Sequence, residues 1–182
     1  IALEELGLHY RVHPIDIVAG DQNEPAYAAI CPNRKVPAIV DSDGPGGEPL
    51  TLWESGAILV YLADKAGALI PRDPARRAQC LQWLFWQMAG LGPMAGQNHH
   101  FSHYAPEKLP YAVERYVKET NRLYGVLDKR LAGNAFLAGE GGDVVVHPLQ
   151  DIQGHHRVDR RLDLELEHVG GEDLDAGPLA EA

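Results

Sequence analysis

The sequence is poor in cysteine and has no long apolar run. Its 182 residues include two cysteines, Cys31 and Cys80, whose spacing fits neither a zinc site nor a CxxC motif. A disulfide framework is therefore not expected, and a reducing cytoplasm is the predicted location. No stretch approaches about 18 consecutive apolar residues, so neither a transmembrane helix nor a signal peptide is predicted.

Basic residues are also scarce, because 16 Lys and Arg stand against 26 Asp and Glu. A nucleic-acid footprint needs clustered positive charge, so no nucleic-acid partner is expected. The acidity is uneven: residues 141–182 carry ten acidic and three basic residues, a net charge of −7, and the preceding part carries 16 and 13, a net charge of −3. The main body is therefore close to neutral, and an apolar content of 45% supports a core there.

Aromatic residues and lysines stop before the C-terminal segment, the last of them being Phe136 and Lys129. Residues 141–182 keep strand-like alternation at Leu162, Leu164 and Leu166, with too few apolar neighbours to build a core. We expect this acidic segment to be poorly ordered. A reading-frame shift after about Glu140 and a genuinely divergent tail are the two explanations.

The most informative segment runs from residue 33 to residue 65. Two short strands, Val36–Val40 and Pro49–Leu52, are predicted on either side of a DGPGG turn, and a helix from about Gly56 to Lys65 follows. Pro37 cannot donate to a ladder, so it marks an edge or a break. If the Val36–Pro37 peptide bond is cis, the N–H and C=O of Val36 stay free for a ligand.

Ser55 lies at the predicted N-cap of that helix. A helix N-terminus offers unpaired N–H groups and a partial positive charge, which suit a carboxylate. The segment could therefore bind peptide-like backbone at one end and an anion at the other. Taken singly, these dipeptides are more simply explained as a strand break and a helix cap.

This pattern resembles the glutathione-binding half of a glutathione transferase. Residues 81–131 resemble the second domain of the Nu-class bacterial branch, which includes disulfide-bond oxidoreductases. The resemblance covers residues 1–140 and implies an α/β plus all-α fold. A thioredoxin-like domain lacking its first strand would occupy residues 1–67, with a linker at 68–76, an incomplete all-helical domain at 77–140 and the atypical tail at 141–182. A sheet without that central strand would leave its neighbours unpaired.

The resemblance also implies where glutathione binds. Val36 and Pro37 would lie beside the cysteine of glutathione, and Glu54 and Ser55 would hold its γ-glutamyl carboxylate. The combination of these two pairs, at the spacing of one hairpin, favours glutathione binding over the separate structural explanations.

Three further residues are candidates. Lys35 could pair with the glycyl carboxylate, and Gln22 falls where the branch has a glutathione-contacting glutamine; a solvated turn lysine and a polar loop residue are the alternatives. Arg115 lies on the long helix predicted at Pro110–Leu131, and the resemblance places it near the thiol or disulfide of the ligand. A guanidinium there would favour the thiolate. Its alternative is a surface pair with Glu119, four residues along.

Three histidines, His99, His100 and His103, invite a metal interpretation because two of them are four residues apart. No carboxylate or cysteine lies at ligand spacing, so no metal site is predicted. These side chains are expected instead to line the interdomain cleft or a dimer surface.

The predicted function is that of an enzyme: a glutathione-dependent thiol–disulfide oxidoreductase or glutathione transferase acting on disulfides or small electrophiles. Glutathione is the cosubstrate, its sulfur is the nucleophile, and a homodimer without membrane or nucleic-acid partners is expected. The thiol-activating loop of the branch would lie before Ile1, so no catalytic residue is assigned other than Arg115. The alternative is a non-catalytic glutathione-binding or regulatory protein of the same fold, or an inactive fragment.

Overall fold

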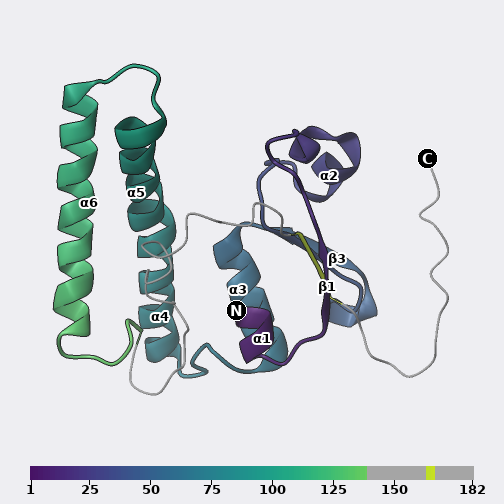
Figure 1. The fold of residues 1–182 in the computed structure, drawn as a ribbon. Helices are drawn as coiled ribbons and strands as arrows, with labels where there is room; N and C mark the ends of the chain where they lie inside the picture. Colours follow the sequence, from purple (N-terminus) through teal and green to yellow (C-terminus); the bar gives the residue numbers. More distant parts are fainter. Residues whose placement is uncertain (139–162, 167–182) are drawn as a thin grey trace. The chain divides into compact units, whose positions relative to one another are not determined.

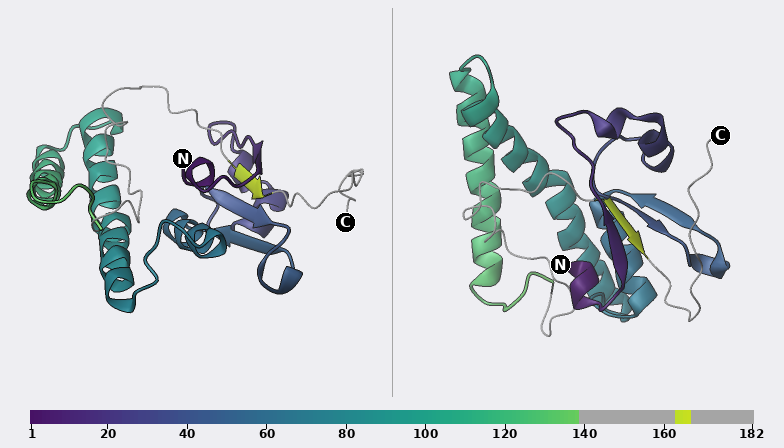
Figure 2. Two further views of the ribbon diagram at one scale, coloured as in Figure 1. Left: turned by 90° about the horizontal axis from the view of Figure 1, so that it is seen from below. Right: turned by 45° about the vertical axis from the view of Figure 1, so that its right-hand side comes forward.

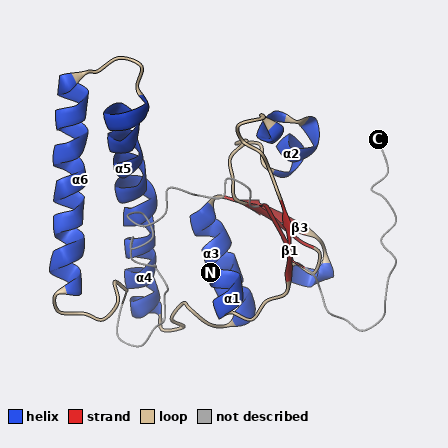
Figure 3. Ribbon diagram, viewed as in Figure 1, coloured by secondary structure: helices blue, strands red, loops and turns tan. Residues whose placement is uncertain are grey.

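The computed structural model describes residues 1–138 and 163–166, and it divides into two compact units. One unit contains residues 1–6 and 54–138 and is helical. The other contains residues 7–53 and 163–166 and holds the sheet, drawn in red in Figure 3. Each unit is described by itself.

The sheet has four strands in the order β1 (Tyr10–His13), β4 (Asp163–Leu166), β2 (Ala38–Asp41) and β3 (Leu50–Trp53). β2 and β3 form the predicted antiparallel hairpin, with Ala38 opposite Trp53. β2 begins directly after Pro37, because a residue without an N–H group cannot donate to the ladder. In the turn between the strands, η2 (Pro45–Gly47), Gly46 and Gly47 both have a φ of 79°, which favours glycine.

The second strand of the sheet comes from the C-terminal segment. β4, yellow in Figure 2, pairs antiparallel with β1 and parallel with β2, so that Leu164 lies opposite both Val12 and Ile39. The expectation that a missing strand leaves its neighbours unpaired is therefore wrong, since β4 supplies backbone partners to both. The alternation at Leu164 and Leu166 does mark a strand. The expected low order of the rest of 141–182 concerns residues outside the described part of the chain.

A short helix packs against the segment that leads into β2. The turn η1 (Asp21–Asn23) leads into α2 (Pro25–Ile30), which begins with a proline at its first position, where no N–H partner is needed. Tyr27 and Cys31 are buried together with Ala38, the first residue of β2. This small core holds the chain on both sides of the loop at residues 32–37.

The helical unit contains α1 (Ala2–Glu5), α3 (Ser55–Ala66), α4 (Pro74–Trp86), α5 (Gly92–His99) and α6 (Pro110–Leu131). The π-helical turn η3 (Gln87–Leu91) joins α4 to α5, and a second, η4 (His100–Tyr104), extends α5. α6 has the predicted bounds and runs alongside α5 (Figure 1). The apolar face of α6 is buried through Leu123 and Leu127.

A salt bridge connects α3 to α4. The guanidinium of Arg77 donates two hydrogen bonds of 2.8 Å to the carboxylate of Asp64. α3 ends at Ala66 and is followed by the glycine C-cap Gly67, whose φ is 67°. α4 begins at Pro74 after the cap residue Asp73, whose carboxylate accepts a hydrogen bond from the backbone N–H of Arg76.

The Arg77–Asp64 pair predicts a pH dependence. Hydrogen bonding from Arg77 holds the pKa of the Asp64 carboxyl below its ordinary value of 3.8. Because the folded pKa is depressed, the pair stabilises the fold above that ordinary value, and this contribution is lost as the pH falls through the folded pKa. Arg77→Met should raise the pKa of Asp64 toward 3.8, measured by carboxyl-carbon NMR titration. Lys129→Met, which removes a cation from α6, is the control, and an unchanged Asp64 titration in Arg77→Met would contradict the assignment.

Candidate functional site

The loop before β2 contains one residue, Val36, whose backbone groups have no hydrogen-bond partner among the described residues. The Val36–Pro37 peptide bond is cis, the geometry in which the N–H and C=O of Val36 are expected to stay free for a ligand. No backbone hydrogen bond to a described residue occupies the N–H or the C=O of Val36. The side chain of Val36 packs against the small core of Tyr27, Cys31 and Ala38. An extended ligand could therefore pair with this residue as an added strand does with a sheet edge.

Two side chains of the core fix the peptide just before Val36. The hydroxyl of Tyr27 donates to the carbonyl of Lys35 at 2.7 Å, and the thiol of Cys31 donates to the same oxygen at 3.3 Å. Both donors are buried, with 4% and 1% exposure. Sequence reasoning did not find this arrangement, because a tyrosine in a short helix has no periodic signal that separates hydrogen bonding from packing.

Removal of the Tyr27 hydroxyl should destabilise the fold. Tyr27→Phe deletes one donor to a carbonyl beside the core, so we expect the free energy of unfolding to fall by about 1 kcal/mol. Chemical denaturation followed by circular dichroism measures this loss. Tyr111→Phe, which removes a hydroxyl from a side chain that is 77% exposed, should leave the stability unchanged. Equal stability of the two variants would rule out a structural role for the Tyr27–Lys35 hydrogen bond.

Gln22 lies in η1, and only one of the two polar atoms of its carboxamide has a hydrogen-bond partner among the described residues. The Nε2 group donates to the carbonyl of Ile17 at 3.3 Å, and Oε1 is buried without a hydrogen-bond partner among the described residues. A buried acceptor without a donor costs roughly 1–3 kcal/mol, a cost that a ligand N–H would remove. The orientation of Gln22 therefore suits a ligand contact.

Directly after β3, at the same end of the hairpin, Glu54 has an uncommon backbone conformation. Its φ is 72° and its ψ is 108°, a combination that costs energy for any residue with a side chain and that occurs often at ligand sites. Glu54 is the N-cap of α3, and its carbonyl accepts from the N–H of Ile58 at 2.9 Å. The prediction that Ser55 is the cap is wrong by one residue, since Ser55 is already the first residue of the helix.

Because Ser55 does not cap the helix, its hydroxyl is used elsewhere. It donates to the thioether sulfur of Met88 at 3.5 Å. Within the part of the chain that the structure describes, no side chain caps the first turn of α3, so the N–H groups at this helix start are suited to an anion. Sequence reasoning missed Met88, because the contact joins residues 33 positions apart.

The predicted residues fall in both units. The sheet unit carries Gln22, Lys35, Val36 and Pro37, and the helical unit carries Glu54, Ser55 and Arg115. Within the sheet unit, the pairing of Ala38 with Trp53 means that the chain enters β2 and leaves β3 at the same end of the hairpin. Pro37 and Glu54 are the residues joined covalently to that end.

Arg115 lies in a groove between α5 and α6 with a volume of about 670 Å³. The groove is lined by aromatic, charged and thioether side chains, namely Met94, Tyr111, Glu114, Arg115, Tyr116, Lys118, Glu119 and Arg122. The two helices are linked beside it by the Thr120 hydroxyl, which donates to the Met94 carbonyl at 3.4 Å.

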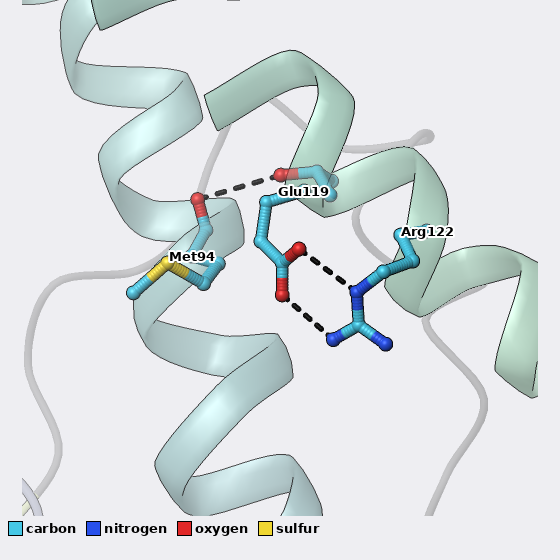
Figure 4. A network of polar contacts seen from close by, with 4 residues as sticks. Met94, Glu119 and Arg122 are labelled. Atoms are coloured by element: carbon cyan, nitrogen blue, oxygen red, sulfur yellow. Dashed lines mark hydrogen bonds and ion pairs between the residues drawn. The ribbon is translucent and has the colours of Figure 1, made fainter. Parts of the chain in front are cut away.

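The direct partner of Glu119 is Arg122 and not Arg115. Figure 4 shows the two-pronged contact, in which Arg122 donates to both oxygens of Glu119 at 2.8 and 2.7 Å. These hydrogen bonds lower the pKa of the Glu119 carboxyl, with Arg115 the weakest contributor. Arg115 therefore interacts with Glu119 only through a weaker electrostatic attraction, and the ion pair of Glu119 is with Arg122. The Arg115 guanidinium makes no hydrogen bond or ion pair with a described residue, so it is available to a ligand anion.

The histidines near the end of α5 form an exposed ring cluster. The centroids of His99 and His103 are 4.8 Å apart, and His99 also contacts Tyr104 at 4.9 Å. In the described ranges, no three His, Cys, Asp or Glu side chains are arranged to hold a metal ion, and no helix combines the length and apolarity needed to cross a membrane. The absence of a metal site stays a prediction.

Comparisons with known proteins agree with this architecture. A model of the N-terminal domain of glutathione S-transferases matches residues 1–65. The chain is 52% identical over 161 residues to the disulfide-bond oxidoreductase YfcG of Escherichia coli, a match that covers 86% of this chain and 75% of that protein. The chain belongs to the glutathione S-transferase superfamily. The predicted resemblance to this superfamily, with a thioredoxin-like domain followed by a helical domain, is confirmed.

Two further members of the superfamily bear on function. A glutathione transferase from Pseudomonas putida, solved with one glutathione disulfide bound per subunit, has a TM-score of 0.75 and 47% identity, covering 78% of this chain and 63% of that one. The transcriptional regulator URE2 of Saccharomyces cerevisiae is 40% identical over 138 residues, covering 72% of this chain and 38% of that protein. The chain therefore spans between 38% and 75% of the length of these three relatives.

Proposed function

We propose that this protein is a glutathione-dependent enzyme that exchanges thiols and disulfides, with glutathione as its cosubstrate. The observation that carries the proposal is the backbone of Val36. It has no hydrogen-bond partner among the described residues, and the Lys35 carbonyl before it is held by Tyr27 and Cys31. A tripeptide can pair with such a backbone, and its thiolate can then attack a disulfide sulfur. The attack forms a mixed disulfide and releases the other sulfur as a thiolate.

Each neighbouring residue complements one part of glutathione. The cysteinyl N–H and C=O match the C=O and N–H of Val36, and the exposed ammonium of Lys35 matches the glycyl carboxylate. The Oε1 atom of Gln22 offers an acceptor to a ligand N–H. These contacts would hold the tripeptide in an extended conformation along the entry to β2.

The γ-glutamyl end of glutathione carries both a carboxylate and an ammonium group. The N–H and hydroxyl of Ser55, at the start of α3, complement the carboxylate. Glu54 carries the opposite charge, which complements the ammonium group. The uncommon backbone conformation of Glu54 turns the chain between β3 and α3. A ligand-binding role for Glu54 would explain why this energetically costly conformation is kept.

Loss of the Ser55 hydroxyl should weaken glutathione binding. A hydrogen bond to a charged group contributes about 1.5–3 kcal/mol, so Ser55→Ala should raise the dissociation constant roughly 10- to 150-fold. Isothermal titration calorimetry with glutathione and with its disulfide measures the effect. Ser42→Ala, at an exposed serine of the hairpin turn, should bind as the unchanged chain does. Undetectable glutathione binding by the unchanged chain would refute the proposed function.

Arg115 is proposed to favour the thiolate form of bound glutathione. A guanidinium without an ion-pair partner in the described chain can lower the pKa of a nearby thiol. Arg115→Met should therefore shift the pH dependence of kcat/KM for disulfide reduction to higher pH and slow turnover at neutral pH about tenfold. Arg115→Lys should recover part of the loss, and Lys129→Met should behave as the unchanged chain does. An unshifted pH profile in Arg115→Met would exclude this role.

A regulatory protein that binds glutathione without turnover is the second candidate, and the similarity to URE2 of S. cerevisiae favours it. Binding and turnover measured on the same preparation separate the two candidates, because a regulator would bind glutathione without reducing a disulfide.

We also propose a homodimer in the cytoplasm. A reducing compartment would keep both cysteines as the free thiols that the structure has.

A further inference from the structure

The Ser55 hydroxyl, which is proposed to bind the glutathione carboxylate, donates a hydrogen bond to a methionine sulfur. Met88 lies in η3, is half-buried, and accepts the Ser55 hydroxyl hydrogen bond at 3.5 Å. A serine hydroxyl has a single hydrogen to donate, so it can serve either the sulfur or a carboxylate. A thioether is a weak acceptor, and a ligand carboxylate can therefore displace it.

Gly56 allows the thioether to lie directly against the first turn of α3. A Cβ atom built on Gly56 would be 3.1 Å from Cγ of Met88 and 3.4 Å from its sulfur, so any side chain there would press on the thioether. The glycine thus places the sulfur beside the backbone at the proposed anion site. A polar atom added to this sulfur would come within reach of the Ser55 hydroxyl.

We propose that Met88 is an oxidation site at which a hydroperoxide switches off glutathione binding through Ser55; the proposal rests on the function proposed above. The thioether sulfur attacks the peroxide, the O–O bond breaks, and one oxygen is transferred to give methionine sulfoxide while an alcohol or water leaves. The sulfur is oxidised by two electrons and the peroxide is reduced by two. The sulfoxide oxygen is a strong acceptor that retains the Ser55 hydrogen against the glutathione carboxylate.

Burial keeps the two cysteines from competing with Met88 for a peroxide, and the second methionine serves as a comparison. The chain has two methionines and two cysteines. Cys31 and Cys80 are 1% and 2% exposed, and thiol oxidation requires an accessible thiolate. The second methionine, Met94, lines the groove that contains Arg115. Met94 is half-buried like Met88, which makes it a matched comparison.

The test is limited oxidation of the 182-residue chain with hydrogen peroxide, with mass spectrometry of peptides to locate the added oxygen and calorimetry with glutathione before and after. Oxidation of Met88 should weaken glutathione binding about tenfold, and methionine sulfoxide reductase should restore it. Met88→Leu should keep its own untreated affinity after peroxide, and Met94→Leu should still lose about tenfold. Leucine preserves the volume of the side chain, so both variants should fold.

The Ser55→Ala variant tests whether the sulfoxide acts by accepting the Ser55 hydrogen bond or only by blocking the site through its size. Without the hydroxyl, oxidation of Met88 should cause no further loss, and a further tenfold loss would overturn the proposed mechanism. Unoxidised Met88 under conditions that oxidise Met94, or peroxide sensitivity retained in Met88→Leu, would overturn the proposal itself. Failure of the untreated chain to bind glutathione would instead refute the proposed function, so the two failures are distinguishable.

Discussion

The pairing of β2 with β3 is the constraint on which the candidate site depends. Because Ala38 lies opposite Trp53, the chain enters and leaves this hairpin at one end. On the entering side, Pro37 cannot extend the ladder, and the backbone groups of Val36 are unpaired with respect to the described residues. On the leaving side, Glu54 turns the chain into α3 with an uncommon backbone conformation. The same register therefore creates both a backbone docking position and a helix start.

Each of these two positions is supported by side chains that sequence motifs do not reveal. Tyr27 and Cys31 donate to the Lys35 carbonyl from a buried core. Met88 accepts from Ser55 and lies against Gly56, where a larger residue would interfere. The first arrangement is a fixed support, since both donors are buried. The second is adjustable, because a weak acceptor can be displaced by a carboxylate or strengthened by oxidation.

Charge pairing along α6 decides which cation remains available. Glu119 could pair with a cation on either side along the helix, at positions 115 and 122. Arg122 forms both hydrogen bonds to the carboxylate, and Arg115 contributes only a weak electrostatic effect. The choice between these two neighbours depends on side-chain conformation beside α5. Both arginines line the groove, but Arg122 is paired with Glu119 there and Arg115 has no hydrogen bond or ion pair with a described residue.

The sequence by itself determined the hairpin, the bounds of α6, the short helix after Glu54 and the membership of the superfamily. The hairpin and the helices depend on local periodicity and turn residues, and the superfamily was indicated by a resemblance that extends over residues 1–140. Tertiary structure alone decided that β4 stands between β1 and β2, that Tyr27 supports Lys35, and that Met88 engages Ser55. Such pairings depend on three-dimensional proximity. Local sequence patterns do not indicate which distant segment completes the sheet or which distant residue accepts a hydrogen bond.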